Sequence, residues 1–148
     1  MISSKQMKQK LAFYSLYLAW MISLAAVFGS LYFSEIAKFP PCVLCWYQRI
    51  FLYPLALLIP VGMFRKDKSL PFYVLPLIFI GTLISIYHNM LQYGLISEEL
   101  SPCTLGVSCV TKYVEFFGFI SIPFLALLSF VIIGILMVYN LKVNRELP

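Results

Sequence analysis

The chain has 148 residues, of which 61% are hydrophobic and 11% charged, and its mean hydropathy is +0.90. A soluble domain is about half apolar and carries charge on about a quarter of its residues. So few polar side chains cannot cover a globular surface in water, and the composition therefore excludes a soluble enzyme, a disordered tail and a nucleic-acid-binding protein. We interpret the net charge of +5 as a signal of membrane topology rather than of an anionic partner.

Four apolar segments are long enough to cross a lipid bilayer, at residues 11–33, 42–64, 70–94 and 117–141. A membrane helix needs about 20 apolar residues, so these spans use most of the chain. They must be helices, because lipid satisfies no open backbone groups and four strands cannot close a barrel. The prediction is an all-α membrane protein, in which residues 1–148 form one integral membrane domain, a four-transmembrane-helix bundle.

The first segment follows a basic stretch, as the apolar part of a secretory signal peptide does. Its apolar run is too long for such a peptide, and no clear cleavage site ends it before Tyr32. We therefore expect a retained helix.

Basic residues flank the four spans unequally. Most lie at the amino terminus, between the second and third spans, or in the carboxyl tail: Lys5, Lys8, Lys10, Arg65, Lys66, Lys68, Lys142 and Arg145. The positive-inside rule then places both termini in the cytoplasm. Two short loops, near residues 34–41 and 96–115, face outward. Cys103 and Cys109 lie in the second loop, and Cys42 and Cys45 lie where the first loop enters the second span, so all four cysteines are on the outer side. Disulfides form and persist on that side of the membrane.

Cys42 and Cys45 form a Cys-x-x-Cys pair where the first outer loop enters the second span. The preceding Pro40-Pro41 favours a helix start at this point. Cys-x-x-Cys pairs at helix N-termini have lowered thiol pKa values, which makes their disulfide easier to reduce. The position predicts a redox-active pair rather than a structural disulfide.

Arg49 lies on the same helical face as Cys42 and Cys45. A guanidinium inside a span is costly and indicates a function, either to hold a thiolate at Cys45 or to donate hydrogen bonds to a reducible carbonyl. The alternative is an interfacial arginine that reaches the headgroups. His88 in the third span lies at a similar depth, with Gln92 one turn further. It is either a packing residue or a donor of a proton or hydrogen bond to a reduced acceptor.

The second outer loop holds Cys103 and Cys109, separated by five residues that include Gly106. This spacing does not match a zinc knuckle, so we predict no metal site. Two exchanging redox pairs are the favoured interpretation. Two structural disulfides are the alternative, and handling of copper or zinc would require a metal bound at the four cysteines.

Several segments resemble the DsbB family of disulfide-bond formation proteins: residues 29–36, 41–50, 53–55, 84–88 and 118–127. The specific part is the motif Cys-x-x-Cys-x-x-x-Arg in a membrane span, which runs here from Cys42 to Arg49. The resemblance is closest to the BdbC branch of Gram-positive bacteria, whose second outer loop is short like the one that holds Cys103 and Cys109.

The resemblance implies a membrane thiol oxidase in the cell membrane. Such an enzyme reoxidises an extracytoplasmic thioredoxin-like protein of the DsbA or BdbD type and passes the electrons to a membrane quinone. The Gram-positive resemblance favours menaquinone over ubiquinone.

The resemblance also implies roles for single residues. Cys103 forms the mixed disulfide with the partner, and its pair Cys109 exchanges with Cys42. Cys45 is then released as a thiolate next to the quinone. Arg49 assists at the quinone, and His88 matches a histidine that the family carries in its third helix.

Two other functions fit the same residues. One is a quinone reductase similar to the vitamin K epoxide reductases, which are also four-helix bundles with two cysteine pairs. The other is a small transporter or assembly subunit whose disulfides are structural. A co-purifying quinone would exclude the second, and the redox state of the partner after deletion would separate an oxidase from a reductase.

Overall fold

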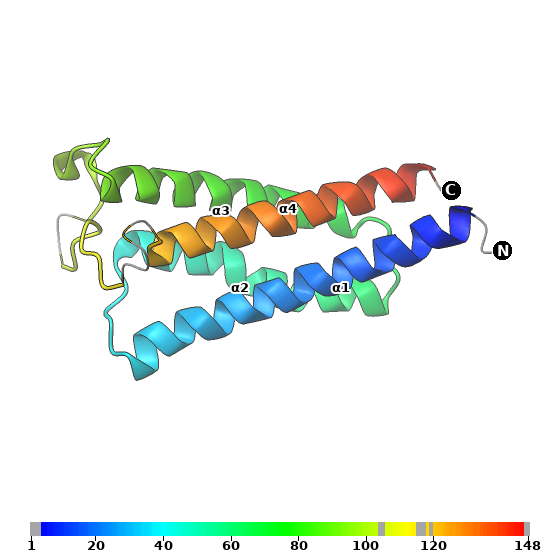
Figure 1. Ribbon diagram of the computed structural model, residues 1–148, viewed down its shortest axis with the longest axis horizontal. Coiled ribbons are helices and arrows are strands. Elements are labelled where there is room, and N and C mark those ends of the chain that lie inside the picture. Colours follow the sequence, from blue (N-terminus) through cyan, green and yellow to red (C-terminus); the bar gives the residue numbers. More distant parts are fainter. Residues whose placement is uncertain (1–3, 104–105, 115–117, 119, 147–148) are drawn as a thin grey trace.

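The computed structural model describes residues 4–103, 106–114, 118 and 120–146. Its long helices are α1 (Ser4–Leu31), α2 (Val43–Phe64), α3 (Leu70–Gln92) and α4 (Ile122–Glu146). Each is long and apolar enough to cross a membrane. The predicted all-α architecture with four spans is confirmed (Figure 1).

The ends of α1 differ from the predicted span. This helix begins at Ser4, ahead of the predicted start at residue 11, because its polar first turns continue the same helix beyond the apolar stretch. At the other end a π-helical turn, η1 (Tyr32–Ile36), continues α1 into the region predicted as a loop. Hydropathy detects where a helix becomes apolar, not where it starts or ends.

The third helix is shorter than predicted, and the fourth is shifted toward the carboxyl end of the chain. Gly94 has a φ of 72°, and the Leu95 N–H donates to the Met90 carbonyl, which closes α3 at Gln92 instead of residue 94. The start of α4 at Ile122 is set by Pro123, which is tolerated in a first helical turn. The predicted start at residue 117 lies outside the described residues.

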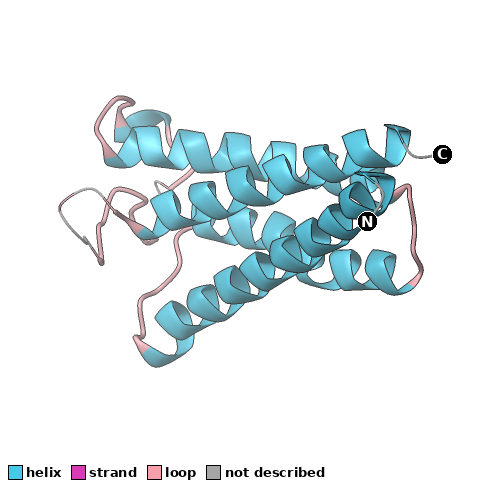
Figure 2. Ribbon diagram, turned by 45° about the vertical axis from the view of Figure 1, so that its right-hand side comes forward, coloured by secondary structure: helices cyan, strands magenta, loops and turns pink. Residues whose placement is uncertain are grey.

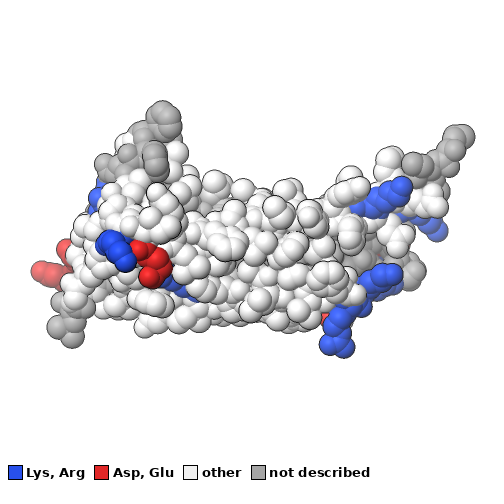
Figure 3. Space-filling model, turned by 90° about the horizontal axis from the view of Figure 1, so that it is seen from below, with Lys and Arg blue, Asp and Glu red and all other residues white. Residues whose placement is uncertain are grey.

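The four helices form a ring in which α1 packs on α2 and α4, and α3 packs on the same two helices. Both ends of the chain lie at one end of the bundle, and both cysteine-bearing loops lie at the other (Figure 1). Toward the cysteine end, α1 diverges from α4 in two views (Figures 1 and 2). On the face shown in Figure 3, the long middle carries almost no charge, and Lys and Arg gather at the end that holds the termini.

An apolar core holds the bundle together. Its buried residues come from all four helices: Ala19, Leu52, Leu55, Ile59, Leu70, Val74, Ile78, Phe130, Ile133 and Met137. Gly81 of α3 packs closely against the ring of Phe130, which is fully buried. A glycine is needed there because a Cβ would occupy the space of the ring.

Polar side chains of one helix donate hydrogen bonds to backbone carbonyls of a neighbouring helix. Pro60 has no N–H, so the Ala56 carbonyl lacks its usual partner, and Trp20 Nε1 of α1 donates to that carbonyl at 3.1 Å. Asn140 Nδ2 of α4 donates to the Ala12 carbonyl at 3.0 Å. Such contacts matter in a membrane because lipid offers no replacement partner.

We expect Gly81→Ala to destabilise the bundle by about 1–3 kcal/mol, the usual cost of overpacking a core. The added Cβ would lie 2.5 Å from two ring atoms of Phe130. The thermal unfolding midpoint in detergent, followed by circular dichroism, should fall. Gly29→Ala is the matched control, because its Cβ would meet nothing within 4 Å. Equal midpoints for the two variants would contradict this account of the α3–α4 contact.

Candidate functional site

Cys42 is the N-cap residue of α2 and has an extended backbone with φ −72° and ψ 171°. Its Sγ accepts the N–H of Cys45 at 3.4 Å, a position that a side-chain oxygen usually takes. The two sulfurs lie 3.0 Å apart, and both residues are free cysteines. The predicted helix start at this pair is observed, and it places the Cys42 sulfur at the positive end of the α2 dipole.

The surroundings of Cys42, which precedes the first residue of the α2 span, favour its thiolate form. The hydrogen bond with the Cys45 thiol lowers the pKa of Cys42 most, and the hydrogen bond with His88 lowers it further. Burial acts in the opposite direction but is outweighed. The pKa of Cys42 therefore lies well below that of an ordinary thiol.

His88 of α3 is 1% exposed and lies between the two cysteine pairs. Its Nε2 is 3.7 Å from Cys42 Sγ and 3.2 Å from the carbonyl oxygen of Cys109. Its Nδ1 is 3.3 Å from Nε2 of Gln48, which is a hydrogen-bond donor. Because a carbonyl only accepts, these contacts assign the proton to Nε2. His88 therefore donates toward both Cys109 and Cys42.

The second outer loop is anchored beside this histidine. Cys103 and Cys109 form a disulfide and are 3% and 1% exposed. The Cys103 N–H donates to Ser101 Oγ at 3.1 Å, and Tyr87 Oη of α3 donates to the Leu100 carbonyl at 3.1 Å. Cys103, Cys109 and Cys42 share one buried cluster. The two cysteine pairs are thus neighbours in space.

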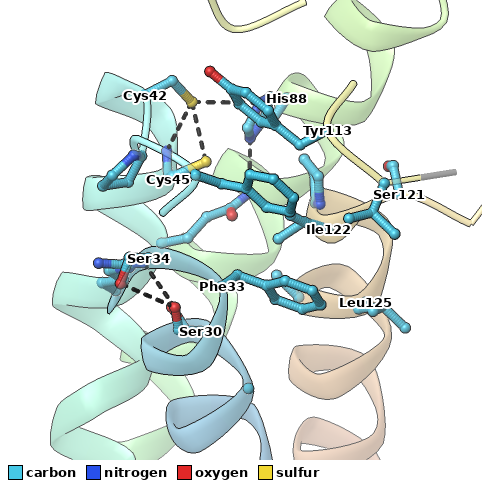
Figure 4. Close-up of a pocket in the computed structure, with 18 of the residues that line it drawn as sticks. Ser30, Phe33, Ser34, Cys42, Cys45, His88, Tyr113, Ser121, Ile122 and Leu125 are labelled. Carbon is cyan, nitrogen blue, oxygen red and sulfur yellow. Dashed lines mark hydrogen bonds between the residues drawn. The ribbon is translucent and has the colours of Figure 1, made fainter. Parts of the chain in front are cut away.

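A cavity of about 340 Å³ lies beside the first pair (Figure 4). Its walls are mostly apolar and come from α1, α4 and the outer loops, among them Ala26, Gly29, Phe33, Tyr113, Ile122 and Leu125. Two polar side chains in the lining, Gln92 and Ser121, each bury an oxygen that has no hydrogen-bond partner among the described residues. Unsatisfied buried polar atoms beside a cavity indicate a ligand that supplies their partners.

Arg49 lines the same cavity one turn after Cys45. Its Nη2 donates to the Ser30 carbonyl of α1 at 3.0 Å, and its guanidinium lies 5.2 Å from the ring centroid of Trp46. The described hydrogen bond therefore goes to the backbone of α1. A guanidinium has five donors, so this bond leaves others for a ligand in the cavity.

The structure brings the predicted site residues to one end of the bundle. Five of them line the cavity: Cys42, Cys45, Arg49, His88 and Cys109. The sixth, Cys103, is joined to Cys109 by the disulfide. Sequence reasoning missed Gln48 and Ser121. Gln48 could have been noticed as a polar residue in an apolar span, three positions after Cys45, whereas nothing in the sequence distinguishes Ser121.

Comparison with known proteins gives a consistent result. A family model described as "Disulfide bond formation protein DsbB" matches residues 13–140. "Disulfide bond formation protein C" of Bacillus subtilis (strain 168) is 49% identical over 131 residues, which is 88% of this chain and 94% of that protein. "Probable disulfide formation protein C 2" of Bacillus cereus (strain ATCC 10987 / NRS 248) is 45% identical over 133 residues, 90% of this chain and 94% of its own length. No solved structure matches the chain.

We expect His88→Ala to slow the alkylation of Cys42 at acidic pH. The His88 hydrogen bond helps to lower the pKa of Cys42 to about 4, so its loss raises that pKa and leaves less thiolate. At a pH below about 4, where the thiolate is the minor form, the rate should fall about tenfold for each unit by which the pKa rises. Mass spectrometry of reduced protein treated with iodoacetamide over a pH series would measure this.

Tyr87→Phe is the matched control for this measurement. Tyr87 precedes His88 in α3, but its hydroxyl bonds the Leu100 carbonyl and not a cysteine. In Tyr87→Phe, the alkylation rate of Cys42 should depend on pH as it does in the unmodified protein. If His88→Ala gives that same profile, the assigned hydrogen bond does not stabilise the thiolate.

Proposed function

Because the chain belongs to the DsbB family of disulfide bond formation proteins, we propose that it is a quinone-linked membrane thiol oxidase. Its thiol donor is an extracytoplasmic thioredoxin-like protein of the DsbA or BdbD type. The observation that carries the proposal is that His88 lies between Cys42 and Cys109, beside an apolar cavity. This arrangement suits the transfer of electrons from one cysteine pair to the other and then to an acceptor in the membrane.

The first stage is oxidation of the partner by the Cys103–Cys109 disulfide. A partner thiolate attacks Cys103, forms a mixed disulfide and releases Cys109 as a thiolate. The partner's second thiolate then displaces Cys103, so that the partner leaves as a disulfide. Two electrons and two protons now reside on Cys103 and Cys109.

The second stage is exchange between the two pairs. The Cys109 thiolate attacks Cys42 of an oxidised Cys42–Cys45 pair and releases Cys45. Cys103 then attacks Cys109, which re-forms their disulfide and releases Cys42 as a thiolate. The His88 Nε2–H group supports this step, because it donates toward the departing sulfur while it holds the Cys109 backbone.

The third stage returns the first pair to its disulfide. Cys42 and Cys45 together give up two electrons and two protons as a bond forms between their sulfurs. A membrane quinone supplies a lipid-soluble acceptor for both. The cavity fits a quinone headgroup, since its apolar walls suit the ring and the Ser121 hydroxyl, whose oxygen has no partner among the described residues, can donate to a quinone oxygen. Arg49 would hold a quinone oxygen, and His88 would lie within reach of the same group.

Orientation and acceptor complete the proposal. The basic end of the bundle, which holds both termini, lies in the cytoplasm, and the cysteine end faces the outside of the cell membrane (Figure 3). Menaquinone is the proposed acceptor, because the similar proteins come from Bacillus species.

We expect Cys45→Ser to abolish quinone reduction by a reduced thioredoxin-like partner, because no disulfide can then form in the first pair. The loss should be at least about 100-fold, as for removal of a reacting group. Quinone absorbance in detergent micelles would follow the reaction.

The variant Cys103→Ser/Cys109→Ser serves as the matched control. It should lose reduction driven by the protein partner, but it should keep reduction driven by a small dithiol, which reaches the first pair directly. If Cys45→Ser reduces quinone at the normal rate, the oxidase function is wrong. If both variants retain partner-driven activity, the cysteines are structural.

We expect Arg49→Leu to raise the KM for quinone by between about tenfold and 100-fold, because a hydrogen bond to a charged group contributes about 1.5–3 kcal/mol. Arg49→Lys should restore part of the affinity, since it keeps the charge but not the planar donors. Partner oxidation in a single turnover should stay unchanged in both variants. A slowed single turnover with an unchanged KM would place Arg49 at the thiols instead.

A further inference from the structure

We propose that the reduced Cys42–Cys45 pair and His88 form a binding site for one thiophilic cation of the Zn²⁺ or Cd²⁺ type. The bound cation would hold the protein in its reduced state and so inhibit it; this consequence rests on the proposed oxidase function, whereas the binding does not. The site differs from the four-cysteine site that the spacing argued against, because its third ligand comes from α3 and Cys103–Cys109 remains a disulfide.

The positions of the three ligand atoms support the proposal. Cys42 Sγ, Cys45 Sγ and His88 Nε2 all lie within 4.8 Å of one another. In a tetrahedral zinc site with Zn–S of about 2.3 Å and Zn–N of about 2.0 Å, sulfur and nitrogen are about 3.5 Å apart. The distance from Cys42 Sγ to His88 Nε2 is 3.7 Å. The two sulfurs, 3.0 Å apart, would separate by less than about 1 Å through side-chain rotation.

The backbone of Cys109 offers a fourth ligand next to His88. The carbonyl oxygen of Cys109 lies 3.2 Å from His88 Nε2. A tetrahedral zinc site separates an oxygen and a nitrogen ligand by about 3.3 Å. The carbonyl, or a water in its place, would complete the coordination.

Gln48 can serve as the outer partner of the histidine. A metal at Nε2 requires the imidazole proton to move to Nδ1, which lies 3.3 Å from the Gln48 amide. Rotation of that amide presents its oxygen to Nδ1–H. A ligating histidine almost always donates its second N–H in this way, and loss of the outer partner costs about 10–100-fold in affinity.

The ligand types select the cation. Two thiolates and one imidazole favour soft and borderline ions over Mg²⁺ and Ca²⁺, which need oxygen ligands. Burial of Cys42 and His88 excludes competing water, and the lowered pKa of Cys42 leaves its sulfur ready to bind metal.

Binding depends on the redox state of the pair. The cation replaces the protons of the two thiols, and no electrons move. In the disulfide both sulfurs are already bonded to each other, so no thiolate remains. Cation binding and disulfide formation therefore exclude one another.

The test uses the full-length chain with Cys103→Ser and Cys109→Ser, which removes the other thiols but keeps the Cys109 backbone carbonyl. Cd²⁺ is titrated into the reduced protein in detergent, and the ultraviolet thiolate-to-metal absorption is recorded. We expect saturation at about one equivalent and no band once Cys42 and Cys45 are oxidised to a disulfide. Adding His88→Ala should weaken binding by at least about tenfold, and Gln48→Leu by about 10–100-fold.

Tyr87→Phe in the same background is the matched control and should bind like the parent. No saturable band, equal binding by the oxidised protein, or a His88→Ala affinity equal to that of Tyr87→Phe would overturn the proposal. Zn²⁺ should also protect Cys42 and Cys45 of the unmodified chain from alkylation until a chelator is added. This second experiment does not depend on the folding of any variant. If the unmodified protein reduces no quinone even when no cation is present, the oxidase function is wrong. The result of the binding experiment is not affected by that outcome.

Discussion

The contact on which the rest of the site depends is the imidazole of His88, whose Nε2 lies against both Cys42 and the backbone of Cys109. Through this ring α3 joins the N-terminus of α2 to the second outer loop. The ring is buried and held from its other side by Gln48. The two cysteine pairs are therefore held close together, although most of α2 and all of α3 lie between them in the sequence.

Each such polar contact is important because the bilayer around the helices is apolar and offers no hydrogen-bond partners. Inside a bilayer, a donor or acceptor must find its partner within the protein or in a ligand. Trp20 and Asn140 meet this demand by donating to backbone carbonyls of neighbouring helices. The unpaired oxygens of Gln92 and Ser121 do not, and both lie in the lining of the cavity. The same rule thus explains the polar contacts between helices, and a ligand in the cavity would supply partners for Gln92 and Ser121.

Local patterns accounted for much of the site. The double proline and the helix start placed Cys42 and Cys45 on one turn, and the spacing placed Arg49 on their face. The same patterns did not reveal that the Arg49 guanidinium bonds the Ser30 carbonyl, because that carbonyl belongs to α1 and is opposed to α2 only in the folded bundle. These patterns also did not reveal the Gln48–His88 contact, because in the sequence Gln48 is only one polar residue in an apolar helix.

The sequence by itself determined the membrane class, the four spans and the short-range cysteine pairs, because these depend on apolar length and on contacts between residues at most six positions apart. Only the tertiary structure decided which groups from different helices meet: His88 with Cys42 and Cys109, and the α1 and α4 walls with the cavity. The physical reason is that helix rotation and packing set these distances. Both arise from the fit of many side chains, such as Phe130 against Gly81, and no periodicity in a single helix encodes them.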